Sequence, residues 1–270
     1  MKIGVRGHDF GKKQPRDLAE LLRGFGLDAA QLAVPKAIEG IASYFDADEN
    51  LLDEIKREFS ANEIEISVLG CYIEPSLPDP QLRKEQISIF KRGIECAAAL
   101  EAGVIGTETT KFSGSQRERE RALGFLYESV EEMLEKADSI GVKAAIEPVW
   151  EHTLNTPELT EKLIRRYSQL GIIFDPVNLL NGENVHSQGE FWKRALDLFG
   201  ERIDAVHIKD ADYKSGRFSS CRLGEGIMEY SFIARWLSSN KPDAPLLREG
   251  VWPGSEAEEF SWMRKTFDAS

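Results

Sequence analysis

The sequence predicts an α/β protein whose single domain, residues 1–270, is a closed (β/α)8 TIM barrel. Short β-branched runs alternate eight times with longer amphipathic segments, which is typical of strands that alternate with helices. No Pro/Gly/Ser-rich linker interrupts this alternation, so one α/β domain is expected. The chain has 270 residues, and 270/8 gives about 34 residues for each unit, a normal length for such a barrel.

The strands are predicted where short apolar runs occur. The run 64–69 interleaves Ser and Glu with apolar residues, whereas 171–174 is apolar throughout, as expected of a buried parallel strand. No GxGxxG follows the first strand, which disfavours an open dinucleotide-binding sheet. The eight predicted strands are 2–5, 29–34, 64–69, 103–107, 142–146, 171–174, 203–208 and 244–247.

The helices are predicted from apolar spacing and from residues that begin or end helices. Leu18, Leu22 and Phe25 recur at helical spacing, and Gly141 is suited to end the helix before it. Thr156 is a suitable N-cap, and Pro157 fits the first helical position. The predicted helices are 14–25, 50–59, 79–100, 116–140, one that opens at 156–158, 191–199, 230–237 and 256–267.

The composition restricts the partners of the protein. With 34 Lys and Arg against 46 Asp and Glu, the net charge is −12, which argues against nucleic acid or an anionic membrane as the main partner. The three cysteines, an odd number without a CxxC pair, do not suggest a disulfide framework. Neither a signal peptide nor a transmembrane run is recognisable, so a cytoplasmic protein with a small-molecule substrate is expected. A homo-oligomer is left open.

Four polar residues end consecutive predicted strands in the second half of the chain. Glu147, Asp175, His207 and Glu249 each follow an apolar run. In a (β/α)8 barrel the carboxyl ends of the strands meet at one mouth, where reactive side chains gather. We therefore expect the four side chains to project into the same space.

Three carboxylates beside one imidazole predict a bound cation, because like charges at close range repel strongly where the dielectric is low. A mixed set of oxygen and nitrogen ligands suits one divalent metal ion, Mn²⁺, Mg²⁺, Co²⁺ or Zn²⁺, better than a metal that prefers thiolates. The alternative for any single residue is a structural one, in which strand-end acids cap helices or pair with Lys and Arg.

Several motifs resemble those of the xylose isomerase-like TIM barrels, the sugar phosphate isomerase/epimerase family. They are IEP at Glu147, FDPVN from Asp175, HIKD from His207, LGEG from Leu223 and REG at Glu249. The resemblance covers essentially the whole chain. It implies that Glu147, Asp175, His207 and Glu249 bind one divalent metal, and similarity to ketose 3-epimerases implies that Glu147 and Glu249 are also the catalytic acid/base pair.

The resemblance implies a reaction in carbohydrate metabolism. A ketose or aldose would chelate the metal, which stabilises the enediolate formed when a carbon-bound proton leaves. Return of the proton to the other face gives an epimerase, and its return to the neighbouring carbon gives an isomerase. Whether the sugar is phosphorylated is open, with a slight preference for an unphosphorylated substrate.

Residues near the other strand ends are candidates for contact with the substrate, each with a structural role as the alternative. Arg222, in the long loop after strand 203–208, is chosen because related epimerases direct an Arg from this region to a substrate oxygen. The candidate substrate-binding residues are His8, Glu108, His152, Asn178, Lys209 and Arg222.

Three other functions compete with this interpretation. AP endonucleases of the same superfamily need three metals and many His ligands, whereas this chain has four His and a negative charge. A metal-dependent dehydratase of an inosose-type polyol ketone shares the barrel and the enolate chemistry, and it is the main alternative. A sugar-binding protein without catalysis would have no reason to keep both glutamates.

Overall fold

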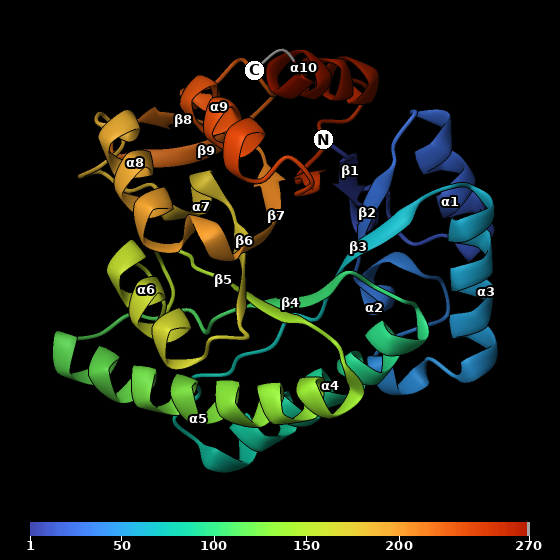
Figure 1. Ribbon diagram of the computed structural model, residues 1–270, viewed down its shortest axis with the longest axis horizontal. Coiled ribbons are helices and arrows are strands. Elements are labelled where there is room, and N and C mark those ends of the chain that lie inside the picture. Colours follow the sequence, from blue (N-terminus) through green and yellow to red (C-terminus); the bar gives the residue numbers. More distant parts are fainter. Residues whose placement is uncertain (269–270) are drawn as a thin grey trace.

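Eight parallel strands close into a barrel in the computed structural model, which describes residues 1–268 (Figure 1). Each strand pairs with its neighbours in the chain, and the last one, β10, closes the barrel against β1. The predicted fold, a single (β/α)8 TIM barrel, is confirmed. The barrel strands are β1 (Ile3–Arg6), β2 (Ala29–Leu32), β3 (Glu65–Gly70), β4 (Val104–Glu108), β5 (Ala144–Glu147), β6 (Gly171–Phe174), β7 (Ile203–Ile208) and β10 (Leu246–Arg248).

Helices cover the outside of the barrel, and the long helices α4 and α5 lie side by side along one edge (Figure 1). Ser115 and Glu118 form a reciprocal capping box at the start of α5, and Gly141 ends this helix with a φ of 79°. Among the described residues, no helix combines the length and apolar character that a membrane span requires. The α-helices are α1 (Pro15–Gly24), α2 (Val34–Ala37), α3 (Glu49–Ala61), α4 (Pro80–Ala99), α5 (Gln116–Ile140), α6 (Pro157–Arg166), α7 (Pro176–Leu179), α8 (Gln188–Phe199), α9 (Tyr230–Asn240) and α10 (Glu256–Asp268), and short 3-10 helices occupy Gly7–Phe10, Tyr44–Asp46 and Gly200–Arg202.

The core has two parts. The larger part fills the space between the barrel and the helices and includes Trp192, Phe90 and Phe174, all fully buried. A small separate cluster fills the inside of the barrel with one residue from each of seven strands. Its members are Ala29, Val68, Val104, Ala145, Ile173, Ala205 and Leu247.

A second layer of side chains lies directly above this inner cluster, nearer the mouth of the barrel. Because the side-chain period of a strand is two, the residue two positions beyond each inner residue faces the same space, nearer the carboxyl end. In β1, Gly4 faces the inside of the barrel, and Arg6, two residues later, faces the same space. This second layer consists of Arg6, Gln31, Gly70, Gly106, Glu147, Asp175, His207 and Glu249.

A β-hairpin stands where the sequence analysis expects a long loop after β7. Its strands, β8 (Asp210–Lys214) and β9 (Arg217–Cys221), pair antiparallel across a turn at Ser215 and Gly216. Both turn residues have positive φ, 51° and 77°, as a tight hairpin turn requires. The interpretation as a loop was wrong. Both strands consist mostly of polar residues with only weak apolar alternation, and β9 has no buried residue, so the sequence pattern does not indicate strands.

Replacement of Gly4 by alanine is expected to destabilise the barrel. A Cβ at this position would lie 2.3 Å from the backbone oxygen of Ala29, which cannot rotate away. We expect Gly4→Ala to lose about 1–3 kcal/mol of unfolding free energy. The control is Gly124→Ala in the exposed middle of α5, where nothing lies within 4 Å of the added carbon and the helix should gain stability. Urea unfolding of both variants measures the difference, and equal midpoints would contradict the expected clash.

Candidate metal centre

Four strand ends bring Glu147, Asp175, His207 and Glu249 together at the mouth of the barrel. One ligand atom from each residue lies within 4.8 Å of all the others. Glu147 ends β5, His207 lies in β7, and Asp175 and Glu249 directly follow β6 and β10. Rigid, hydrogen-bonded strands therefore hold each side chain close to the common centre.

The Nδ1 atom of His207 marks this centre. Glu147 Oε2 and Glu249 Oε2 each lie 3.2 Å from it, and Asp175 Oδ2 lies 3.9 Å away. Within the described residues this buried nitrogen has no hydrogen-bond partner of good geometry. An unpaired buried nitrogen faced by three carboxylate oxygens is the arrangement that a divalent cation satisfies.

The opposite oxygens of Glu147 and Asp175 are held by one residue, Asn178 in α7. Its side-chain amide donates to Glu147 Oε1 at 2.6 Å, and its backbone N–H donates to Asp175 Oδ1 at 3.0 Å. The second contact caps the N-terminus of α7. One oxygen of each carboxylate is thus fixed by the protein, and the other is directed to the centre.

Glu249 is held in the same way from the other side. Arg6 Nη1 lies 3.0 Å and Lys209 Nζ 3.2 Å from Glu249 Oε1, which leaves Oε2 toward His207. Arg6 is itself held by Asp9, whose carboxylate also accepts the backbone N–H groups of Gly250 and Val251. The loop after β10 is therefore fixed to the end of β1.

Lys209 supplies positive charge inside the cluster. Its ammonium lies 2.8 Å from Asp175 Oδ2 and donates to Asn178 Oδ1 at 2.7 Å. Burial raises the pKa of Asp175 to about 6 in spite of this lysine. Burial would also raise the pKa of Glu249, but the positive charges of Lys209, His207 and Arg6 together outweigh burial and lower that pKa to about 2. Within the same cluster, the pKa of Asp175 is therefore raised and the pKa of Glu249 is lowered.

His207 carries a proton when only these side chains surround it. Burial would lower its pKa, but Glu147 and Glu249, with Asp175, raise the pKa to about 9. A histidine that binds a metal must be neutral at the bound nitrogen. Cation binding and protonation therefore compete for the same atom.

The candidate substrate-binding residues are not all at this centre. Asn178 and Lys209 are in it, as described. Glu108 lies beside Glu147 in the register of β4 and β5, and His152 Nε2 is 3.7 Å from Glu108 Oε2. Burial, with Glu147 and Glu249, raises the pKa of Glu108 to about 7, so this carboxyl can carry a proton near neutrality.

His8 and Arg222 occupy the edge of this region. His8 is half-buried in the 3-10 helix after β1, and burial together with Arg6 lowers its pKa to about 4. Its ring packs edge-on against Tyr72. Arg222 is exposed and does not line the cavity at the barrel mouth.

Gln31 is a further residue of the site that was not predicted from the sequence. Its Oε1 lies 2.5 Å from His207 Nε2, although the two residues are 176 positions apart in the chain. The available signal was a single amide within the apolar strand 29–34, two positions beyond the inward-facing Ala29. A lone polar residue at an inward position of a barrel strand indicates a partner at the mouth.

A cavity of about 280 Å³ opens beside the cluster. Arg6, Asn178, Lys209 and Glu249 line it, and β9 contributes Ser219 and Ser220 to the lining. The hairpin therefore forms one wall of the mouth. Asp210, at its base, accepts the backbone N–H groups of Gly224, Gly226 and Met228 and so fixes the LGEG loop.

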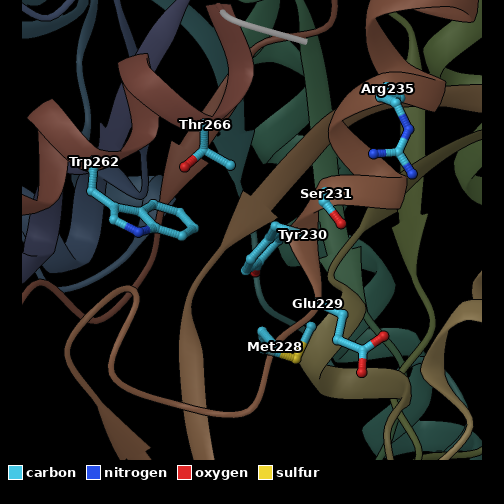
Figure 2. A pocket seen from close by; sticks show the side chains of 7 residues that line it. All are labelled: Met228, Glu229, Tyr230, Ser231, Arg235, Trp262 and Thr266. Atoms are coloured by element: carbon cyan, nitrogen blue, oxygen red, sulfur yellow. The ribbon is translucent and has the colours of Figure 1, made fainter.

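A second cavity lies outside the barrel, in a groove between α9 and α10 (Figure 2). Met228, Tyr230, Arg235 and Trp262 are among the side chains that line it. Among the described residues that line this groove, Glu229 is the one acidic residue, and no group of metal ligands like that at the mouth occurs. Among the described residues, the chemistry of a metal centre is found at the mouth instead.

Comparison with known proteins gives the family and the fold. The xylose isomerase-like TIM barrel family matches residues 19–266, whereas no curated protein matches the chain. A D-tagatose 3-epimerase-like protein is 18% identical with a TM-score of 0.79, over 100% of this chain and 97% of that one. The 3-keto-D-glucoside 4-epimerase of E. coli is 15% identical with a TM-score of 0.79, over 98% and 99%.

A third solved structure is a xylose isomerase-like TIM barrel protein from Mycobacterium smegmatis in complex with magnesium. It is 17% identical with a TM-score of 0.73, over 99% of this chain and 97% of that one. At these identities the likeness concerns the fold, while the family match covers most of the sequence. The chain belongs to the xylose isomerase-like TIM barrel family.

Proposed function

We propose that this protein is a divalent-metal-dependent sugar isomerase or epimerase. It would move a carbon-bound proton next to the carbonyl of a ketose or aldose. One observation carries the proposal: Glu147 and Glu249 each direct one oxygen to the same point, 3.2 Å from His207 Nδ1, while neighbouring side chains hold the other oxygen. Two carboxylates that face one centre are what proton removal and return require.

The residues fit one divalent cation. Glu147, Asp175, His207 and Glu249 would hold it through three oxygens and Nδ1, a donor set suited to Mn²⁺, Mg²⁺, Co²⁺ or Zn²⁺. When bound, the ion would polarise the sugar carbonyl and stabilise the negative charge of the enediolate. The magnesium in the M. smegmatis relative supports a hard cation of this kind.

The side chains would divide the work between binding and proton transfer. One of the two glutamates takes the proton and the other returns one, while Asn178 and Lys209 keep the carboxylates aligned. Glu108, His8 and His152 would contact sugar hydroxyls near the mouth, a role supported by the proximity of Glu108 to Glu147 and of His152 to Glu108. A role for Arg222 would require its exposed side chain to fold over the cavity.

The cavity and the relatives support an unphosphorylated ketose as the substrate. A space of about 280 Å³ suits a monosaccharide, and its wall offers Ser219 and Ser220 as hydroxyl partners. Its cations Arg6, Lys209 and Arg248 are all paired with carboxylates, which favours an uncharged sugar over a phosphorylated one. The D-tagatose 3-epimerase-like relative supports a ketose.

Incubation with ketoses and aldoses in D₂O tests this proposal. The protein is loaded with Mn²⁺ or Mg²⁺, the metal is removed after reaction, and the sugars are analysed by proton NMR. We expect deuterium at one carbon next to the carbonyl, together with an epimer or an isomer. A ketone that has lost water would indicate the dehydratase instead. Binding of a sugar without exchange at any carbon would contradict catalysis.

A further inference from the structure

We propose that Gln31 is a positioning residue that fixes the ring orientation and tautomer of His207, so that Nδ1 is the nitrogen offered to a divalent cation. The inference rests on the metal centre of the proposed function. It adds a residue from β2, on the far side of the barrel mouth from the strands that supply the ligands.

The side chains of Gln31 and His207 are in direct contact. Gln31 Oε1 lies 2.5 Å from His207 Nε2, and both side chains are fully buried. An amide oxygen can only accept a hydrogen bond, so Nε2 must carry the proton. In neutral His207 the lone pair then belongs to Nδ1, which faces the oxygens of Glu147 and Glu249.

The amide of Gln31 is itself held in one orientation. Its Nε2 donates to the hydroxyl of Tyr72 at 2.9 Å, which directs Oε1 toward His207. Tyr72 is fixed in turn beneath Lys36, whose ammonium lies 3.9 Å from the ring centroid. These contacts hold the Gln31 amide with its NH₂ group toward Tyr72 and its acceptor oxygen toward the imidazole of His207.

The backbone makes room for this amide. A Cβ on Gly70 would lie 2.9 Å from Gln31 Nε2 and 3.4 Å from the ring of Tyr72. The neighbouring strand β3 therefore has a glycine where the amide and the phenol meet. An amide buried inside the barrel costs free energy unless it is fully hydrogen-bonded, and here both ends have partners.

The effect of Gln31 on His207 can be tested through metal binding, without any measurement of catalysis. Zn²⁺ affinity is determined by calorimetry, and the His207 tautomer by NMR of ¹⁵N-histidine-labelled protein loaded with Zn²⁺. In the native protein we expect a proton on Nε2 and the metal on Nδ1. Gln31→Met, which keeps the length but removes the acceptor, should lower the Zn²⁺ affinity about 10- to 100-fold. Gln31→Glu, which keeps an acceptor oxygen, should restore most of it.

The control is Gln188→Met, which removes a buried amide that contacts Ile227 O and lies outside the cluster. It should leave Zn²⁺ affinity unchanged whatever it does to the unfolding midpoint. The inference is overturned if Gln31→Met binds Zn²⁺ within twofold of the native protein, or if the native metal sits on Nε2. It also falls if the native protein binds no metal. A protein that binds metal through Nδ1 but exchanges no sugar proton refutes the proposed function and leaves the role of Gln31 intact.

Discussion

Glu147→Gln and Glu249→Gln are each expected to lower the rate of substrate proton exchange about 10³-fold, within the range that acid–base groups contribute. Glutamine keeps the size of the side chain and an oxygen that can accept from Asn178 or Arg6, but it cannot take a proton from carbon. The measurement is deuterium incorporation from D₂O, expressed per bound metal ion, because either change also weakens the ligand set.

The two variants separate the roles of the two carboxylates. A variant that still exchanges deuterium into the substrate but forms no product retains the base for one face of the sugar, and the missing group serves the other. The matched control is Glu131→Gln on the exposed surface of α5, which should be fully active. More than a tenth of the native rate per bound metal in either test variant would contradict its assignment as a catalytic residue.

Metal affinity is expected to rise steeply with pH. The neighbouring carboxylates raise the pKa of His207 to about 9, so in the metal-free protein the imidazole is protonated at neutral pH. A cation must displace that proton, and the apparent affinity should therefore increase about tenfold for each pH unit up to roughly pH 9, then level off. Below about pH 6 the slope should steepen, because Asp175, whose pKa is raised to about 6, must also lose its proton.

Calorimetric titration with Mg²⁺ or Mn²⁺ at several pH values measures how metal affinity depends on pH. Titration in two buffers of different ionisation enthalpy also counts the protons that are released when the metal binds. The control is His186→Ala, because this exposed histidine is remote from the cluster in its contacts and should leave the slope unchanged. An affinity that is flat between about pH 6.5 and 8 would show that His207 is already neutral and would remove the basis of the prediction.

The sequence predicted the barrel and the four clustered residues for the same reason. Strands and helices alternate visibly along the chain, and parallel strands in a barrel must end at one mouth. Glu147, Asp175, His207 and Glu249 lie at or directly after the carboxyl ends of their strands, so their proximity depends on topology alone. The predicted strand ends differ from the observed ends by at most two residues. For example, β1, β5 and β10 each end one residue later than predicted, at Arg6, Glu147 and Arg248.

The residues that hold those ligands were harder to predict, because their roles depend on distant partners. Gln31 is one amide in a four-residue strand, and nothing local links it to His207. Arg6 comes directly after the predicted strand 2–5, but its ion pair with Glu249 spans the closure of the barrel from β1 to β10. Contacts of this kind between strands depend on how the strands are aligned with one another. The sequence pattern predicts that alignment only to within one or two residues.

The account depends most directly on whether these four strand ends form one metal site. The decisive measurement is elemental analysis after equilibrium dialysis against each of Mn²⁺, Mg²⁺, Co²⁺ and Zn²⁺, for the native protein and for the Asp175→Ala/His207→Ala double variant. We predict about one equivalent of metal in the native protein and none in the folded double variant. A native protein that retains no metal from any of these solutions, or a double variant that binds as much as the native protein, would contradict the account.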